Sequence, residues 1–266
     1  MPRKNQYKYN IDRKTLKRLY VKKDLSQKQI ADIYGCDAMT IGNYLRRYGL
    51  LAKQRNGKFQ YPFYVNKEFF KNWSHDMAWL LGYTTADGCV RPHKYELRWK
   101  SIDYDLLEHV KFILETNYEI KDDKNTNCYS LTIYSKEIIS DLLVLGVGPR
   151  KSLTVEFASV PDEYFWSYMR GITDGDGYVS PPGSAIRWQV TSNRKFLHVM
   201  IGHLSQLIGC PHYKLNPQGR AFAVGVYGKH ACLALENMYG NDLYGLARKK
   251  KTALRAIKFR KEAYDN

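Results

Sequence analysis

The stretch LLGYTTADG, residues 80–88, returns 89 positions later as MRGITDGDG, residues 169–177. The similarity continues without a gap through residues 80–110 and 169–199. The identical pairs include Gly82 and Gly171, Asp87 and Asp176, Gly88 and Gly177, Val90 and Val179, Pro92 and Pro181, Arg98-Trp99 and Arg187-Trp188, and His109-Val110 and His198-Val199. A repeat of this length is typical of a duplicated structural unit. The sequence therefore predicts two copies of one unit, each opening with a helix that ends in an acidic turn.

The composition of the 266-residue chain favours a globular protein with a polyanionic partner. Its hydrophobic content of 44% is sufficient for a packed core, and its length suggests one or two domains. The formal net charge is +16 at pH 7, and the excess is concentrated in residues 1–58, which hold 15 Lys and Arg against 4 Asp. Such a balance indicates nucleic acid, with solubility alone as the alternative.

The five cysteines are scattered and form no CxxC pair. They therefore predict neither a disulfide framework nor a zinc knuckle. The N-terminal residues are polar and basic rather than signal-like, and no apolar run approaches the roughly 18 residues of a membrane span. We expect a soluble, intracellular protein of a reducing compartment with no membrane contact.

Residues 1–52 are predicted to form a small unit of helix-turn-helix type. Ser26 is suited to cap one helix, Gly35 to end it in a left-handed turn, and Asp37 to cap the next helix. Ala31 places a small residue where the two helices cross. The apolar stripes expected to face inward are Ile30, Ile33 and Tyr34 in the first helix and Ile41, Tyr44 and Leu45 in the second.

In a helix-turn-helix the second helix lies in the major groove of DNA. The side chains that it would present here are Thr40, Asn43, Arg46 and Arg47. The surrounding Lys and Arg residues favour DNA binding, and an ordinary helical hairpin is the alternative. Residues 53–72 are interpreted as a basic linker, because they lack periodicity and contain Gly57 and Pro62.

Each repeat is predicted to run helix, two strands, helix, two strands, helix. We expect the first repeat at residues 73–148, a connecting segment at 149–162 and the second repeat at 163–266. Strand alternation places Trp99 and Trp188 in the core. The side chains on the opposite, polar and mostly basic strand face are Arg98, Lys100, Arg187 and Gln189, and we expect them to contact DNA.

Small residues four positions apart mark both repeated helices: Gly82 and Ala86 in the first, Gly171 and Gly175 in the second. This spacing lets two helix backbones approach closely. Asp87 and the equivalent aspartate would then lie side by side at the negative ends of two helix dipoles, which is unfavourable without a cation. Divalent cations relieve that conflict, and Mg²⁺ prefers carboxylate oxygen. Taken singly, each Asp-Gly pair is an ordinary helix stop.

The two motifs resemble the paired motifs of the LAGLIDADG homing endonucleases, in their single-chain, two-repeat form, over about residues 74–260. The resemblance implies an α+β fold of duplicated αββαββα repeats, arranged as a saddle of antiparallel strands with pseudo-two-fold symmetry. It also implies that the last acid of each motif binds catalytic Mg²⁺. The implied metal site comprises Asp87, Asp176, Gly88 and Gly177.

The motif departs from the family pattern at two places in this chain. Thr85 stands where the second repeat has Asp174, at a position that varies in the family. Met169-Arg170 is an unusual opening to the second motif, expected to affect packing more than chemistry.

The implied activity is site-specific hydrolysis of both strands of double-stranded DNA by a monomer, as in intron homing. The family also places a basic residue near each scissile phosphate. The candidates here are Lys151 and Lys249, with Lys250 and Lys251 as alternatives to the second. Two other functions stay open: an RNA maturase of the same fold that binds intron RNA, and a DNA-binding regulator that does not cleave.

Overall fold

The computed structural model describes residues 9, 11–23, 25–50, 53–55, 58–60, 63–124, 126–149, 155–181 and 185–262. The chain divides into two compact units. One comprises residues 1–66 with 108–119, and the other comprises residues 67–107 with 120–266. Within the described part of the chain, no helix is long and apolar enough to cross a membrane.

The N-terminal unit contains the two helices expected from the caps Ser26 and Asp37, together with a helical segment before them. They are α1 (Arg13–Lys17), which continues as the π-helical turn η1 (Arg18–Lys22), then α2 (Gln27–Tyr34) and α3 (Ala38–Arg47). Ser26 caps α2 through a reciprocal capping box with Gln29. Gly35 ends α2 at a left-handed φ of 62°, and the Asp37 carboxylate accepts from the Thr40 amide to start α3.

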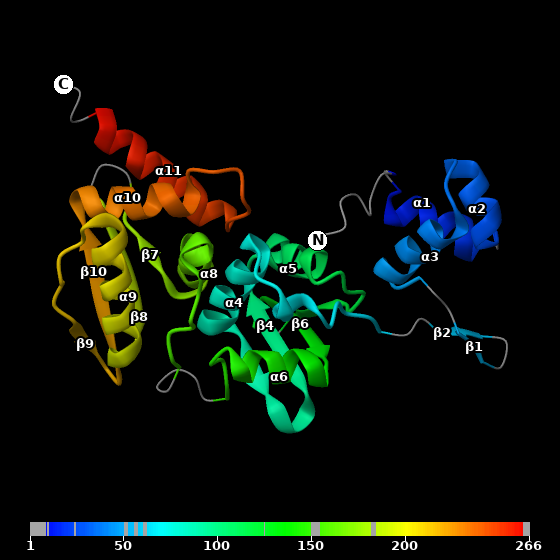
Figure 1. Cartoon of the computed structure of the whole chain (residues 1–266), viewed down its shortest axis with the longest axis horizontal. Helices are drawn as coiled ribbons and strands as arrows, with labels where there is room; N and C mark the ends of the chain where they lie inside the picture. Colours follow the sequence, from blue (N-terminus) through cyan, green and yellow to red (C-terminus); the bar gives the residue numbers. More distant parts are fainter. Residues whose placement is uncertain are drawn as a thin grey trace. The chain divides into compact units, whose positions relative to one another are not determined.

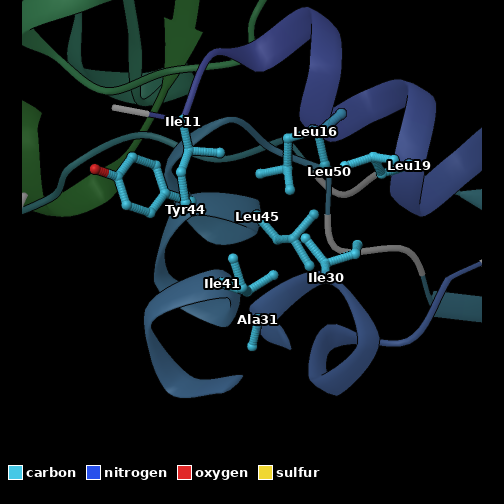
Figure 2. Packing of buried hydrophobic residues seen from close by; sticks show 9 residues of the cluster. All are labelled: Ile11, Leu16, Leu19, Ile30, Ala31, Ile41, Tyr44, Leu45 and Leu50. Atoms are coloured by element: carbon cyan, nitrogen blue, oxygen red, sulfur yellow. The ribbon is translucent and has the colours of Figure 1, made fainter. Parts of the chain in front are cut away.

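The core of this unit is an apolar cluster that the helices share, as Figure 2 shows. The cluster comprises Ile11, Leu16, Leu19, Ile30, Ala31, Ile41, Tyr44, Leu45 and Leu50, all buried. The predicted inward positions Ile41, Tyr44 and Leu45 are confirmed. The prediction for Ile33 is wrong, because this side chain is 59% exposed. The buried face of α2 is centred on Ile30 and Ala31, and at about 100° per residue the Ile33 side chain points away from it.

Two short strands lie inside the segment predicted to be a linker. They are β1 (Lys53–Arg55) and β2 (Lys58–Gln60), paired antiparallel with Lys53 opposite Gln60. Further along, the Tyr64 amide donates to Asn117 Oδ1 at 2.6 Å, and the Asn66 amide donates to the Leu114 carbonyl at 2.9 Å. These hydrogen bonds explain why residues 108–119 group with the N-terminal unit.

The rest of the chain confirms the duplicated αββαββα order. The first copy contains α4 (His75–Asp87), β3 (Cys89–Arg91), β4 (Glu96–Ser101), α5 (Tyr104–Ile113), β5 (Ile120–Asp123), β6 (Cys128–Tyr134) and α6 (Lys136–Val144). The second contains α8 (Phe165–Asp176), β7 (Tyr178–Val179), β8 (Arg187–Ser192), α9 (Arg194–Ile208), β9 (Asn216–Gln218), β10 (Ala221–Tyr227) and α10 (Gly228–Tyr239).

One further helix, α11 (Ala247–Glu262), follows the second copy. Three short 3₁₀ turns complete the described elements: η2 (Phe69–Lys71), η3 (Pro92–Lys94) and η4 (Asp162–Tyr164). The two sheets have equivalent antiparallel strand orders, β3-β4-β6-β5 and β7-β8-β10-β9. Helices α9 and α10 pack on the second sheet, and α11 packs on α10 (Figure 1).

The two repeated tryptophans are core residues, as predicted. Trp99 and Trp188 are fully buried, and their indole N–H groups donate to Thr84 Oγ1 at 3.1 Å and Thr173 Oγ1 at 3.0 Å. These two threonines occupy equivalent positions in α4 and α8. Each sheet is therefore fastened to the motif helix of its own repeat by the same buried hydrogen bond, which satisfies an indole donor that would otherwise be costly to bury.

Candidate metal centre and nucleic-acid interface

Helices α4 and α8 lie against each other at the centre of the duplicated unit (Figure 1). A Cβ atom added at Gly82 would lie 2.1 Å from the Tyr168 carbonyl oxygen, and one added at Gly171 would lie 2.0 Å from the Trp79 carbonyl oxygen. Backbone atoms cannot move away as a flexible side chain can, so only glycine fits at either position. The close approach predicted from the small-residue spacing is confirmed.

The contact between α4 and α8, which we call the helix seam, also brings the C-terminal ends of the two helices together. A Cβ atom at Gly175 would lie 2.5 Å from the Ala86 Cβ and 3.2 Å from Asp87 Oδ2. The carboxylate of Asp87 therefore lies against the α8 backbone, one residue before Asp176. Both aspartate side chains are exposed to solvent. We call the pairs Asp87-Gly88 and Asp176-Gly177 the acidic turns.

The acidic turns have the donor chemistry that a hard divalent cation requires. Carboxylate oxygens are the preferred ligands of Mg²⁺, which commonly keeps several waters and takes one or two carboxylates from the protein. Within the described ranges, no group of three or more His, Cys, Asp and Glu side chains is placed to hold a metal ion. Backbone, substrate or water oxygens could complete the coordination of a cation held by the two carboxylates.

The motif glycines end the two helices with ordinary negative φ angles, −69° at Gly88 and −74° at Gly177. They are required by space, since a Cβ atom would meet backbone atoms of Thr84 at 2.6 Å and of Thr173 at 2.5 Å. Their amides donate back to the carbonyl oxygens of the same two threonines, at 3.0 and 3.1 Å. An N–H group cannot ligate a cation, so any metal contact of these glycines would use the carbonyl oxygen.

Lys249, near the start of α11, places its ammonium group beside the acidic turns. Its ammonium donates to the carbonyl oxygens of Thr173 and Gly175, both at 2.6 Å. The Gly175 carbonyl lies in the last turn of α8, where helix carbonyls lack intrahelical partners, and the Thr173 carbonyl also accepts from the Gly177 amide. Burial lowers the pKa of Lys249 to about 8, against the opposing influence of Asp174. At pH 7 the side chain is therefore still mostly charged.

The neighbouring lysines have different positions. The Lys250 ammonium donates to the carbonyl oxygens of Asn241 and Leu243, at 2.9 and 3.0 Å, in the connection between α10 and α11. Lys251 is exposed. Among these three candidates, Lys249 is the residue whose hydrogen bonds place it at the acidic turns. Lys151, the candidate for the first repeat, lies outside the described residues.

The four strand residues predicted to contact DNA lie on the faces opposite the tryptophans. In the first sheet Arg98 is opposite Thr132 and Lys100 is opposite Ser130, so the face is polar across two strands. Lys100 is exposed and pairs with Asp123 Oδ2 at 3.2 Å. In the second sheet Arg187 and Gln189 are half-buried, and the Arg187 guanidinium lies 5.0 Å from the centre of the Tyr178 ring.

The four residues predicted on the recognition helix of the N-terminal unit differ in availability. Asn43 and Arg46 are exposed, and Arg46 donates to Asn43 Oδ1 at 2.8 Å. The Thr40 hydroxyl donates to Asp37 Oδ2 at 2.9 Å, so it completes the helix cap. Arg47 is half-buried, with its guanidinium 5.9 Å from the centre of the Tyr48 ring.

Asp174 is a residue beside the acidic turns that was not among the predicted site residues. The family resemblance implies a less critical role for this position, where the first repeat has Thr85. The Asp174 side chain is 2% exposed and accepts three hydrogen bonds, from residues distant in the sequence. The available signal was a pair of charged residues, Arg170 and Asp174, four positions apart in a helix predicted to pack against another helix.

Comparison with known proteins agrees with this geometry. Residues 74–143 match the family model described as a LAGLIDADG-like domain. No curated protein matches the chain. The family model does not cover the second motif, so the similarity of that part of the chain rests on its fold.

Three solved structures illustrate the fold similarity. The homing endonuclease I-SmaMI, bound to an uncleaved DNA target in the presence of calcium ions, has a TM-score of 0.52 and 12% identity, over 73% of this chain and 92% of the other. The homing endonuclease I-WcaI, bound to its DNA recognition sequence, has a TM-score of 0.50 and 11% identity, over 78% of this chain and 97% of the other. Full-length DUF199/WhiA from Thermatoga maritima has a TM-score of 0.50 and 16% identity, over 73% of this chain but only 65% of its own length.

At these identities the solved structures establish the fold alone. The chain has a LAGLIDADG fold preceded by N-terminal helices, and its resemblance to the LAGLIDADG family, expected from the two motifs, is confirmed.

Proposed function

We propose that the protein is a site-specific, metal-dependent DNA endonuclease that hydrolyses both strands of its target. The observation that carries the proposal is the meeting of the two acidic turns. Asp87 lies against the α8 backbone beside Asp176, and both carboxylates are exposed at the same seam. A fold that only binds DNA has no need for two adjacent carboxylates at the negative ends of two helices.

In this proposal Asp87 and Asp176 hold the divalent cation, with Mg²⁺ as the expected ion and the carbonyl oxygens of Gly88 and Gly177 as further candidate ligands. The bound cation would lower the pKa of a water molecule and neutralise charge on the phosphate. The chain itself supplies Lys249, whose ammonium at the end of α8 can stabilise the additional negative charge of the transition state. Lys151 is proposed for the equivalent role at the other strand.

The polar sheet faces support a nucleic-acid substrate. Arg98, Lys100, Arg187 and Gln189 lie on the side of each sheet away from the tryptophan core. Two relatives in fold, I-SmaMI and I-WcaI, were solved bound to DNA targets. Because both repeats lie on one chain, we propose that a monomer cuts both strands of a double-stranded target. Because the strand residues of the two repeats differ, the target need not be a palindrome.

A pooled library of random duplex sites, incubated with the full chain in Mg²⁺ or in EDTA, tests this proposal. The expected result is double-strand cleavage at one sequence in Mg²⁺ and intact DNA in EDTA. Binding to one DNA sequence with no cleavage in Mg²⁺ or Mn²⁺ would overturn the proposal in favour of a regulator. A parallel pool of structured RNA identifies the maturase alternative, which predicts tighter binding to RNA than to any duplex.

We also propose that the N-terminal unit contacts DNA beside the cleaved site through α3. Replacing Arg46 with alanine should weaken binding to the recovered site about threefold to tenfold and reduce the slope of log K against log salt by about 1, as loss of one phosphate contact does. Cleavage at saturating protein should change little. The matched control is Lys28→Ala, an exposed lysine on α2. Equal effects of the two substitutions would show that α3 has no specific role.

A further inference from the structure

The second motif helix carries two buried charged residues where the first carries uncharged ones. Under the shift of 89, Arg170 replaces Leu81 and Asp174 replaces Thr85. Arg170 and Asp174 are each 2% exposed and lie one turn apart on α8. The Thr85 hydroxyl donates to the Leu81 carbonyl of its own helix, at 2.8 Å. Since the first repeat forms the same helix without buried charge, the two charges of the second serve something specific to that repeat.

Asp174 gathers donors from three separate segments. Its Oδ2 accepts from the Trp79 indole N–H at 2.9 Å and from the Leu246 amide at 3.0 Å, and its Oδ1 accepts from the Tyr239 hydroxyl at 2.7 Å. Trp79 belongs to α4 and Tyr239 ends α10. Leu246 is the residue immediately before α11. A buried carboxylate with three donors is a strong and specific anchor, because removing it leaves all three donors unsatisfied.

Arg170 fixes the other end of the same connection. Its Nη1 donates to the Met238 carbonyl at 2.8 Å and lies 3.4 Å from Asn241 Oδ1, while its Nη2 donates to Ser167 Oγ at 3.2 Å. Arg170 therefore binds the last turn of α10 and the start of the connection to α11, while Asp174 binds the residue before the connection, Tyr239, and its last residue, Leu246. Both residues that make these hydrogen bonds lie on α8, the helix whose last turn leads into the second acidic turn.

Leu246 in turn determines where Lys249 lies. The amides of Lys249 and Lys250 donate to the Leu246 carbonyl, at 2.9 and 2.8 Å, and so build the first turn of α11 on this residue. The Lys249 ammonium then reaches back to the Thr173 and Gly175 carbonyls at the end of α8. Helix α8 thus binds the residue before α11 through Asp174, and its last carbonyls accept from Lys249, which lies about one turn further along α11.

We infer that Asp174 is a positioning residue that holds the start of α11 so that the Lys249 ammonium lies at the acidic turns, and that Arg170 assists by fixing the start of the connection. The inference rests on the proposed function where it concerns cleavage. Where it concerns the placement of α11, it depends only on the hydrogen bonds given above. The Asp174 side chain is buried from solvent, so we infer that its effect on the reaction passes through Lys249.

Three substitutions separate this role from general packing. Asp174→Thr installs the residue of the first repeat, whose hydroxyl can bond within its own helix but cannot reach Leu246 as the carboxylate does. Asp174→Asn keeps an oxygen for Trp79 and Leu246, and its amide can donate to the Tyr239 hydroxyl, so it should restore the anchor. Tyr239→Phe is the matched control, because it removes one donor to the carboxylate and leaves the Leu246 bond in place.

Amide hydrogen exchange of the full chain, without DNA or metal, tests the anchor directly. We expect Asp174→Thr to accelerate exchange at Leu246 and in the first turn of α11 by about tenfold or more, with the Asn and Tyr239→Phe variants close to the wild type. Unchanged exchange in a folded Asp174→Thr protein would overturn the inference. If that variant does not fold, Arg170→Leu provides the second case, and it must accelerate exchange in residues 239–246 for the inference to hold.

Strand-resolved, single-turnover cleavage of the DNA site recovered from the pooled library tests the link to Lys249. Asp174→Thr and Lys249→Met should each slow cleavage by about 100-fold, with affinity changed less than threefold, as expected for a misplaced catalytic group. The double variant should be no slower than Lys249→Met alone, whereas additive losses would contradict the inference. If the wild type cleaves no DNA, the proposed function fails and the exchange result still decides whether Asp174 positions α11.

Discussion

Replacing both Asp87 and Asp176 with asparagine is expected to reduce double-strand cleavage by about 1,000-fold or more. Loss of a bound cation removes several kcal/mol of transition-state stabilisation, and about 4 kcal/mol corresponds to a factor of about 1,000. Asparagine keeps the size of each side chain and removes its charge. Binding to the recovered site should stay the same or tighten, because two negative charges leave a surface that approaches phosphates.

The single substitutions carry information that the double variant does not. If each carboxylate serves one strand more than the other, Asp87→Asn and Asp176→Asn should leave nicked products, read by labelling each strand separately. The matched control is Glu163→Gln, which removes an exposed charge near the start of α8 rather than at its end. Cleavage that survives in the double asparagine variant would show that the acidic turns are not the catalytic metal site.

Gly171→Ala is expected to lower the free energy of unfolding of the duplicated unit by about 3 kcal/mol or more. The added Cβ would lie 2.0 Å from the Trp79 carbonyl oxygen and 2.7 Å from the Tyr83 amide nitrogen. Overpacking of this kind costs about 1–3 kcal/mol when side chains can adjust, and the obstacle here is the backbone of a neighbouring helix. The measurement is urea unfolding followed by circular dichroism. A loss of 3 kcal/mol should also lower Tm by about 10 °C.

Gly202→Ala is the matched control for the helix seam. Gly202 lies within α9, and a Cβ atom there would meet no atom within 4 Å. Alanine is favoured over glycine inside a helix by about 1 kcal/mol, so this variant should be slightly more stable than the wild type. If Gly171→Ala were as stable as Gly202→Ala, the backbones of α4 and α8 could not approach as closely as the structure has them.

The features that followed from the sequence are those that depend on local pattern or on repetition. The shift of 89 aligned two motif helices, and the spacing of Gly82 with Ala86 predicted their contact. Alternation along the strands placed Trp99 and Trp188 in the core. Each of these inferences needs only a periodicity and a neighbour a few positions away. They were sufficient for the fold class and for the meeting of the two acidic turns.

The features that could not be predicted depend on contacts between residues distant in the sequence. Asp174 bonds to Leu246, 72 positions away, and no periodicity connects them. The choice among Lys249, Lys250 and Lys251 depends on where α11 begins, since one residue turns a helical side chain by about 100°. The pair of Lys100 with Asp123, two strands away, likewise requires the strand order β4-β6-β5.

The most direct test of the central claim is cleavage of the recovered DNA site in Mg²⁺ by the wild type and by Asp87→Asn/Asp176→Asn, compared side by side at protein concentrations that saturate binding. The account predicts a double-strand break with the wild type, and bound but intact DNA with the variant. Equal cleavage by the two proteins, or intact DNA with both, would contradict the claim that the acidic turns form a metal-dependent nuclease site.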